Sequence, residues 1–359
     1  MTNGPDLGFT TLRWADGNLL LLDQTKLPHV EEEMVIESVA PLVDAIQRLC
    51  VRGAPALGCA GAYGMVLGVV DATTPEQWLK ALHESAVTLS AARPTAVNLV
   101  VGVHHIQELG EKLFAATTIA EFDVDLATAK LLDHAIAFHE ADAASCLAIA
   151  ENTLPLLADG SRILTHCNAG ALATGGLGTA LAPIHLGHSR GLKFQVFADE
   201  TRPLRQGARL TAWELARHGV PVSVLPDSAA ASLLASGGID FVIVGSDRIA
   251  ANGDVANKIG TFPLAVMAAR FGVPFFVLAP ATTIDPYCPS GADIPIEQRS
   301  AEEIFGEDSA RDGVAIYNPA FDVTPLDLVQ HIITDHGVFQ AHGEGSDTWI
   351  QYVAGLSQQ

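Results

Sequence analysis

Residues 239–247 have the sequence Ile-Asp-Phe-Val-Ile-Val-Gly-Ser-Asp, and residues 162–170 have the sequence Arg-Ile-Leu-Thr-His-Cys-Asn-Ala-Gly. In both stretches a short apolar run ends abruptly at polar residues or glycine, which is typical of a buried β-strand. Strand-like runs of this kind recur after Gly160, separated by helical patterns, at 162–167, 193–198, 221–225, 239–245, 273–279 and 314–317. This alternation predicts an α/β fold class with a doubly wound, mainly parallel sheet in the C-terminal part of the chain.

The N-terminal part has a different pattern. Residues 11–22 predict two short strands around an Asp16-Gly17-Asn18 turn, because Asp-Gly favours the positive φ angles of tight hairpins. Apolar residues then recur every three or four positions, which predicts helices over 35–116 and 124–157. We therefore expect a smaller, mostly helical N-terminal domain with a short β element over residues 1–140. A Rossmann-like domain is expected over residues 141–359.

Composition and charge exclude several classes of protein. The 359 residues are 49% hydrophobic and 17% charged, whereas an intrinsically disordered chain needs low hydrophobicity and dense charge. The formal net charge is −21, from 20 basic and 41 acidic residues, and no cluster of Lys or Arg offsets it. A general nucleic-acid surface is therefore not expected. A small anionic substrate remains compatible, since a few cations in a pocket suffice to hold a phosphate.

Cysteine usage and apolar stretches indicate a cytoplasmic protein. Five cysteines, an odd number without a CxxC pair, are typical of a reducing compartment. Residues 1–10 have no basic start followed by an apolar run, so no secretory signal is predicted. The stretch from Gly53 to Val70 has no charged residue, but its five glycines and Pro55 favour a buried helix over a membrane span.

Polar residues end several of the predicted strands. In an open parallel sheet, ligands bind beyond the carboxyl ends of the strands, so the thiol of Cys167 and the carboxylates that end the next strands are expected at one edge. Cys167 precedes a glycine-rich segment, 170–179, that we expect to enter a helix, where the dipole would favour the thiolate. The alternatives are a buried structural cysteine and carboxylates that only cap helices.

Asp247 follows the buried run 239–245, so its carboxyl group is expected to be desolvated, with a raised pKa that suits a general acid. An ion pair with the adjacent Arg248 is the alternative. Downstream, Asn257 and Lys258 are expected at the N-terminal end of a helix, where backbone N–H groups and an ammonium suit an anion.

Two arginines of the N-terminal part precede turns that open helices. Arg52 stands before Gly53, Ala54 and Pro55, a combination that could cradle a phosphate, and Arg93 stands before Pro94. Each could equally be a surface arginine. The histidines form no metal motif such as HExxH, so no metal is predicted.

Five segments together resemble the methylthioribose-1-phosphate isomerase family, whose wider family includes regulatory subunits of the translation initiation guanine-nucleotide exchange factor. The resemblance covers nearly the whole chain and is carried by residues 52–58, 93–99, 165–170, 198–215 and 245–261. Members convert 5-methylthioribose 1-phosphate into 5-methylthioribulose 1-phosphate in methionine salvage. The resemblance implies a homodimer that acts on a small sugar phosphate, with no cofactor, no nucleic acid and no membrane.

The resemblance also implies roles for single residues. It places the catalytic cysteine on Cys167 and the proton-donating aspartate on Asp247. It places substrate binding on Arg52, Gly53, Ala54, Arg93, Gln206, Asn257 and Lys258. Of these, only Gln206 was not already suggested by its position in the sequence.

Other functions remain open at this point. A related isomerase would act on 5-deoxyribose 1-phosphate or ribose 1,5-bisphosphate, and a second phosphate would need a further cationic cluster that the sequence does not show. A non-catalytic regulatory subunit is a second alternative, although Cys167, Asp247 and Lys258 together favour an enzyme. A dehydrogenase is not favoured, because 170–179 does not match a dinucleotide-binding fingerprint.

Overall fold

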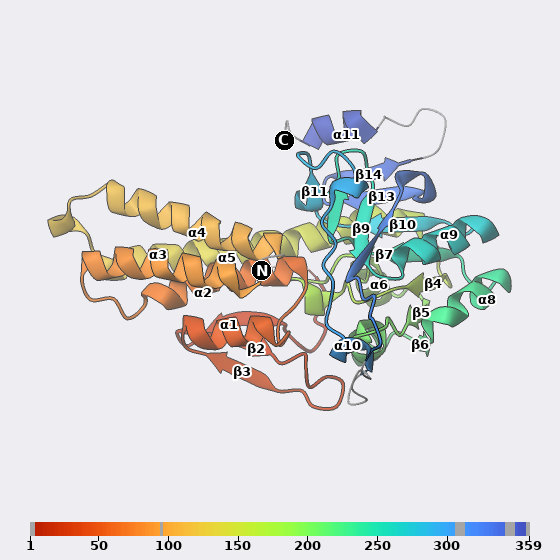
Figure 1. Ribbon diagram of the computed structural model, residues 1–359, viewed down its shortest axis with the longest axis horizontal. Coiled ribbons are helices and arrows are strands. Elements are labelled where there is room, and N and C mark those ends of the chain that lie inside the picture. The colour runs from red at the N-terminus through yellow and green to blue at the C-terminus, as the bar shows by residue number, and fades with distance from the viewer. Residues whose placement is uncertain (1–3, 94–95, 306–312, 342–348, 357–359) are drawn as a thin grey trace. The chain divides into compact units, whose positions relative to one another are not determined.

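The computed structural model describes residues 4–93, 96–305, 313–341 and 349–356 (Figure 1). Their contacts form two compact units, and each is described here by itself. Unit 1 contains Phe9–Ala144 and Ala171–Gly178, and unit 2 contains Gly4–Gly8, Ser145–Gly170 and Thr179–Gln359. The expected division into domains at residue 140 stays a prediction, because compact contacts do not show that either part folds alone.

Unit 1 combines a small antiparallel sheet with a group of helices. Its elements are β1 (Leu12–Ala15), β2 (Asn18–Leu22), β3 (Glu33–Ile36), α1 (Val39–Gln47), α2 (Ala54–Val69), α3 (Pro75–Ala92), α4 (Val97–Ala115) and the first part of α5 (Val124–Thr153). The predicted hairpin is confirmed: Ala15 pairs with Asn18, and the two turn residues Asp16 and Gly17 have φ angles of 51° and 79°. The third strand, β3, was not predicted.

Helix α2 is the centre of unit 1. Thirteen of its 16 residues are buried, which explains why the stretch that begins at Gly53 carries no charge. Where α2 meets α4, a Cβ atom on Gly102 would overlap the backbone carbonyl of Gly58, so glycine permits the close approach of the two helices. In the part of the chain that the structure describes, no helix is long and apolar enough to cross a membrane.

Unit 2 is built on a seven-stranded sheet. Its strands, in the order β14-β13-β10-β7-β4-β5-β6, are β14 (Gly337–Gln340), β13 (His331–Thr334), β10 (Phe275–Leu278), β7 (Phe241–Val244), β4 (Arg162–Thr165), β5 (Gln195–Asp199) and β6 (Val222–Leu225). All neighbours are parallel except β13 and β14. The prediction of a doubly wound, mainly parallel sheet is therefore confirmed.

Helices cover both faces of this sheet. Successive side chains of a strand point to opposite faces, so neighbouring strand residues belong to different apolar clusters. Ile163 and Ile243 belong to the apolar cluster that includes residues of α6 (Ala182–Ser189), α7 (Ala212–Arg217) and the end of α5. Leu164 and Val242 belong to the opposite cluster, which includes residues of α8 (Ala230–Ala235), α9 (Thr261–Phe271) and α11 (Trp349–Leu356).

One predicted strand is wrong. Residues 314–317 form no strand, and Val314 and Tyr317 are 53% and 82% exposed, so this apolar run does not join a core. The sixth parallel strand is β13 instead, in which Ile332 and Ile333 are completely buried.

A second sheet of unit 2 lies beyond β7 along the chain. It has the order β11-β8-β9-β12, from β11 (Ile284–Asp285), β8 (Arg248–Ala250), β9 (Val255–Lys258) and β12 (Phe321–Thr324), and a short helix, α10 (Glu302–Phe305), precedes β12. Strands β8 and β9 carry the segment around Asp247 and Lys258, so this sheet positions part of the candidate site.

Candidate active site

Cys167 and Asp247 follow two adjacent parallel strands at the point where the strand order reverses. Strand β4 pairs with β7 on one side and with β5 on the other, and the chain runs outward from β4 in both directions. Open α/β sheets bind their ligands at such a switch point, outside the carboxyl ends of the strands. The two loops also touch: a Cβ atom on Gly245 would lie 2.6 Å from Cβ of Ala169.

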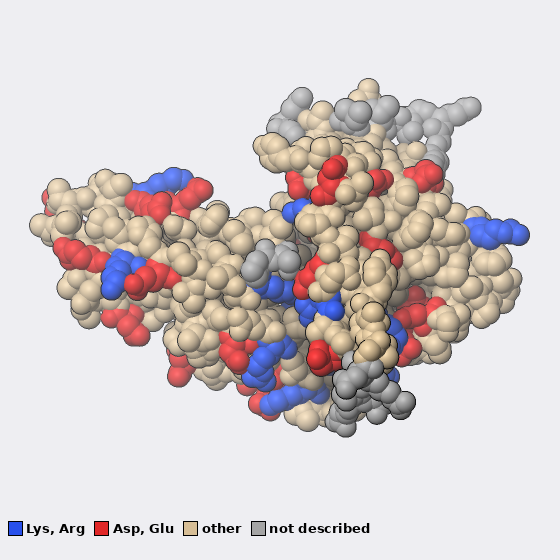
Figure 2. Space-filling model, viewed as in Figure 1, with Lys and Arg blue, Asp and Glu red and all other residues tan. Residues whose placement is uncertain are grey.

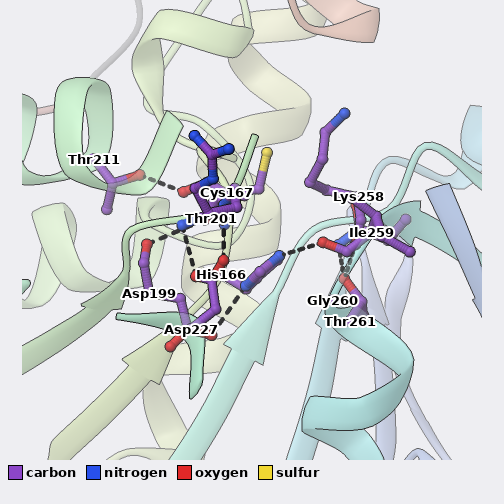
Figure 3. Close-up of polar contacts among 12 residues, drawn as sticks. His166, Cys167, Asp199, Thr201, Thr211, Asp227, Lys258, Ile259, Gly260 and Thr261 are labelled. Carbon is purple, nitrogen blue, oxygen red and sulfur yellow. Dashed lines mark hydrogen bonds and ion pairs between the residues drawn. The ribbon is translucent and has the colours of Figure 1, made fainter. Parts of the chain in front are cut away.

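The turn at Cys167 has a strained backbone that hydrogen bonds hold in place (Figure 3). Cys167 and Thr201 both have left-handed φ angles, 63° and 66°, which are unusual for residues other than glycine and are enriched at functional sites. The N–H of Cys167 donates to Oγ1 of Thr201 at 2.8 Å, and Oγ1 of Thr211 donates to the carbonyl of Cys167 at 2.7 Å. The thiol is thereby presented by a fixed turn.

The glycine-rich segment leads into α6, which begins at Ala182, so the expected helix entry is present. Residues 171–178 belong to unit 1, so the helix begins farther along the chain than the sequence suggested. The N–H of Leu181 at the start of α6 donates to the carbonyl of Ala169 at 3.3 Å, and the expected effect of the helix dipole on Cys167 stays a prediction.

Beside Cys167, His166 forms a buried polar network. Its Nδ1 lies 2.9 Å from Oδ2 of Asp199, and its Nε2 lies 2.8 Å from the carbonyl oxygen of Ile259. Burial alone lowers the pKa of His166, but the hydrogen bond and charge of Asp199 raise it above its ordinary value overall. Burial raises the pKa of Asp199. Both raised pKa values favour retention of a proton between His166 and Asp199.

Among the described residues, His166, Asp199 and Asp227 have the spacing of metal ligands. Their polar atoms are, however, largely occupied by other bonds. The two carboxylate oxygens of Asp227 accept the N–H groups of Thr201 and Arg202, each at 2.7 Å, and Nδ1 of His166 is bonded to Asp199. These bonds already account for the cluster as a structural network, and the expected absence of a metal stays a prediction.

Asp247 is held beside strand β9. Its N–H donates to the carbonyl of Ala256 at 2.9 Å, and the antiparallel pairing of Arg248 with Ala256 places it opposite Asn257. The expectation of a desolvated carboxyl is wrong for this structure, because the chain leaves the buried strand at Val244 and Asp247 is exposed. The adjacent Arg248 forms an ion pair with Asp285 at 3.6 Å.

Asn257 and Lys258 end strand β9 rather than open a helix, since α9 begins at Thr261. Nδ2 of Asn257 donates to Oγ1 of Thr261 at 3.0 Å. Nζ of Lys258 donates to the carbonyl of Ala320 at 3.1 Å and lies 4.8 Å from the centre of the Phe321 ring. In Figure 3, Lys258 and the thiol of Cys167 extend away from the His166–Asp199 pair toward the same side. An ammonium has three donors, so Lys258 retains donors for an anion.

Gln206 also belongs to unit 2, and its side-chain carbonyl oxygen can accept a hydrogen bond from a ligand. The residue is 7% exposed, and its Oε1 accepts no hydrogen bond from any described residue. Since a buried carbonyl oxygen without a donor is costly, a hydroxyl group of a substrate is a suitable partner. The sequence around Gln206 does not by itself indicate a binding role, which was predicted only from the family resemblance.

Arg52, Gly53, Ala54 and Arg93 belong to unit 1. Gly53 has a φ angle of 96°, and a Cβ atom there would overlap Ala173, so only glycine fits before α2. Nε of Arg52 donates to Oε1 of Gln24 at 3.0 Å. Arg93 follows the end of α3, whereas α4 begins at Val97, and Pro94 lies outside the described residues.

Acidic and basic side chains are interspersed on the face of the molecule that Figure 2 shows. Many of the basic residues are paired, for example Lys80 with Glu84 and Lys112 with Glu108 on helices of unit 1. The face drawn shows no extended basic surface in the described part of the chain, in keeping with the small number of Lys and Arg.

Over most of its length, the sequence of this chain is similar to those of known proteins. A sequence profile of the Initiation factor 2 subunit family matches residues 50–341. A methylthioribose-1-phosphate isomerase from Gemmatimonas aurantiaca is 50% identical, over 89% of this chain and 90% of the relative. A 5-deoxyribose 1-phosphate isomerase from Moorella thermoacetica is 47% identical, over 92% of this chain and 93% of the relative.

Two solved structures have the same fold. The 5-methylthioribose 1-phosphate isomerase from Pyrococcus horikoshii superposes with a TM-score of 0.88 and 37% identity, over 99% of both chains. The structure described as translation initiation factor eIF-2B, subunit delta, from A. fulgidus superposes with a TM-score of 0.84 and 40% identity, over 92% of this chain and 96% of that one.

Proposed function

The chain belongs to the Initiation factor 2 subunit family, and we propose that within it the chain converts 5-methylthioribose 1-phosphate into 5-methylthioribulose 1-phosphate, with Cys167 and Asp247 as its catalytic residues. Such an enzyme is an aldose-ketose isomerase of methionine salvage. The observation that carries the proposal is the position of both residues at the switch point of the sheet, after strands β4 and β7.

The reaction explains why two catalytic groups are needed. Phosphate on the anomeric oxygen prevents spontaneous ring opening, so a proton must reach the ring oxygen as its bond to C1 breaks. Asp247 is the proton donor for this step. A hydrogen then moves from C2 to C1 beside Cys167, and the C2 hydroxyl releases its proton, which replaces the proton that Asp247 delivered. C2 thereby becomes the ketone and C1 a reduced carbon. Because C1 is reduced as C2 is oxidised, the reaction needs no redox cofactor.

The remaining residues hold the substrate. In unit 2, Lys258 and Asn257 supply donors for oxygen atoms, and the amide of Gln206 accepts from a hydroxyl group. In unit 1, Arg52, with the N–H groups that follow it at the start of α2, and Arg93 bind phosphate. Backbone N–H groups at a helix start and a guanidinium are suited to this anion.

A related substrate is the second candidate. The Moorella thermoacetica relative, 47% identical, is named 5-deoxyribose 1-phosphate isomerase, and that sugar differs only in lacking the methylthio group. We propose this sugar as an additional substrate of the same site. We also propose a homodimer in the cytoplasm, a location supported by five cysteines that form no disulfide.

The test is turnover of 5-methylthioribose 1-phosphate by the purified protein, followed by phosphorus and carbon NMR without added metal or nucleotide. The wild-type protein is expected to produce the ketose phosphate, and C167S and D247N, folded but inactive, are expected to produce none. A folded wild-type protein without turnover would leave the 5-deoxy sugar, ribose 1,5-bisphosphate and a regulatory role as the alternatives.

A further inference from the structure

His166 connects two loops of the candidate active site through its two ring nitrogens (Figure 3). The ring is 1% exposed, and His166 directly precedes Cys167. Nδ1 reaches Asp199 at the end of β5, and Nε2 reaches the carbonyl of Ile259, which directly follows Lys258. One buried ring therefore joins the segment that carries the thiol to the segment that carries the ammonium.

The partners of the ring define its protonation. A carbonyl oxygen only accepts hydrogen bonds, so Nε2 of His166 carries a hydrogen toward Ile259. The carboxylate of Asp199 likewise accepts, so Nδ1 carries the second hydrogen. Two further carboxylates act on this region electrostatically, Asp227 from the residues after β6 and Asp322 from β12. A cationic ring is thus surrounded by acidic groups of three different segments.

The backbone also leaves room for this connection. Gly260 follows Ile259 with a φ angle of 104°, and a Cβ atom at this position would lie 2.7 Å from Cε1 and 2.8 Å from Nε2 of His166. Any side chain would therefore push the ring away from the Ile259 carbonyl. Glycine at position 260 is a second, independent observation that the fold accommodates this contact.

We propose that His166 is a positioning residue for the isomerisation, and that its two simultaneous hydrogen bonds fix the spacing between the Cys167 turn and the Lys258 loop. The inference rests on the proposed function, which assigns Cys167 to catalysis and Lys258 to substrate binding. His166 does not touch the substrate in this assignment. It acts only through the two segments that it joins.

Three variants separate this role from a general effect on stability. H166N is too short to reach both partners, and G260A displaces the ring. D199N keeps both hydrogen bonds, because the amide N–H of the new side chain can donate to Nδ1 of a neutral ring while Nε2 still donates to Ile259. Comparison of D199N with H166N and G260A therefore separates the effect of the two hydrogen bonds from the effect of the positive charge on the ring.

Two matched controls lie away from the site. D240N removes a carboxylate that pairs with Arg162 at 2.7 Å, at the opposite, amino end of the strands. G272A places a side chain at another left-handed glycine, with a φ angle of 68°, where a Cβ atom meets nothing within 4 Å. Both controls change the same residue types as the test variants without contacting His166.

Steady-state kinetics with 5-methylthioribose 1-phosphate, corrected for the folded fraction, are the first measurement. Displacement of reacting groups by about 1 Å costs on the order of 100-fold in rate, so kcat is expected to fall by that order and KM to rise in H166N and G260A. D199N, D240N and G272A are expected to stay near the wild type. Wild-type kinetics in H166N, or an equal loss in D199N, would overturn the proposal.

A second measurement is independent of turnover. The rate at which iodoacetamide alkylates Cys167 is recorded by mass spectrometry without substrate. Rates are expected to change severalfold in H166N and G260A and to stay unchanged in D199N and the two controls. This pattern with an inactive wild type would refute the proposed function but retain the positioning role, whereas unchanged labelling in H166N would refute the positioning role itself.

Discussion

Gln24 holds Arg52 by its side chain. Oε1 of Gln24 accepts a hydrogen bond from Nε of Arg52 at 3.0 Å, while Nε2 of Gln24 donates to the carbonyl of Leu172 at 2.7 Å. Gln24 is 1% exposed, so both bonds are made in the interior of unit 1. The bond to Nε therefore fixes the orientation of the guanidinium plane of Arg52.

We expect Q24L to weaken substrate binding more than it slows the reaction. Loss of a hydrogen bond that orients a charged group costs about 1.5 kcal/mol, which corresponds to roughly a tenfold rise in KM with little change in kcat. Q24E keeps the acceptor for Arg52 and is expected to raise KM less. Steady-state kinetics check this, with Q77L, an exposed glutamine on α3, as the control. Equal KM values for Q24L and the wild type would contradict the assignment.

The contact between Gly58 and Gly102 predicts a large loss of stability in G102A. The new methyl group would overlap the Gly58 carbonyl and lie 3.1 Å from its Cα, and backbone atoms cannot move aside as a side chain can. Overpacking of this kind costs about 3 kcal/mol, measured by urea unfolding. G110A on the same helix is the control: its methyl group would meet Cδ2 of Leu82 at 2.6 Å, a flexible side-chain end, and a similar loss there would argue against the backbone explanation.

The lowered pKa of His218 predicts that the folded protein loses stability at acidic pH. Burial and the neighbouring His185 and His188 lower its pKa to about 4, whereas an unfolded histidine has a pKa of about 6.5. Between these values the unfolded chain binds more protons, so the free energy of unfolding falls as the pH drops from about 6.5 toward about 4 and is fully retained above that window. His139, whose pKa is also lowered by burial, adds to the same trend.

Urea unfolding at pH 7 and pH 5 tests this prediction. H218Q removes one of the groups that must take up a proton and is expected to lose less stability between the two pH values than the wild type. H29Q, at an exposed histidine, is expected to behave like the wild type. An unchanged difference between pH 7 and pH 5 in H218Q would contradict the role assigned to His218.

The cysteines predict one reactive thiol in the folded protein. All five lie in the described part of the chain and form no disulfide, and Cys50, Cys59, Cys146 and Cys288 are buried whereas Cys167 is partly exposed. Burial also raises the pKa of Cys50 to about 11, which disfavours its thiolate. A disulfide reagent is expected to react rapidly with one thiol in native protein, none in C167S and five after denaturation. Two or more fast thiols would show that the core opens readily.

The parallel sheet could be predicted because its central strands are short apolar runs that end at polar residues. The run at 314–317 is also apolar but is exposed, while β13 has only two apolar residues between His331 and Thr334. Burial on both faces, which separates these two cases, depends on neighbours that are distant in the sequence. Local patterns therefore do not separate a buried strand from an exposed apolar run of this kind.

The candidate site was predicted only as far as strand ends reveal it. The placement of Cys167 and Asp247 after strands β4 and β7 follows from the sequence, because a parallel sheet gathers its strand ends at one edge. The contacts of Gln24 and His166 do not, since Gln24 is bonded to a residue 148 positions away and His166 to one 93 positions away. No periodicity in the sequence encodes such pairs.

The passage of residues 171–178 through unit 1 affects how the chain is made and divided. Unit 1 is not complete when residue 144 has been synthesised, because Gln24 is bonded to Leu172 and Gly53 packs against Ala173. Both of these partners are synthesised only after β4, the first strand of the large sheet along the chain. The two units therefore cannot mature on the ribosome strictly one after the other. A fragment that ends at residue 144 would lack residues 171–178 of unit 1, and a fragment that begins at residue 145 would carry these residues without the rest of unit 1.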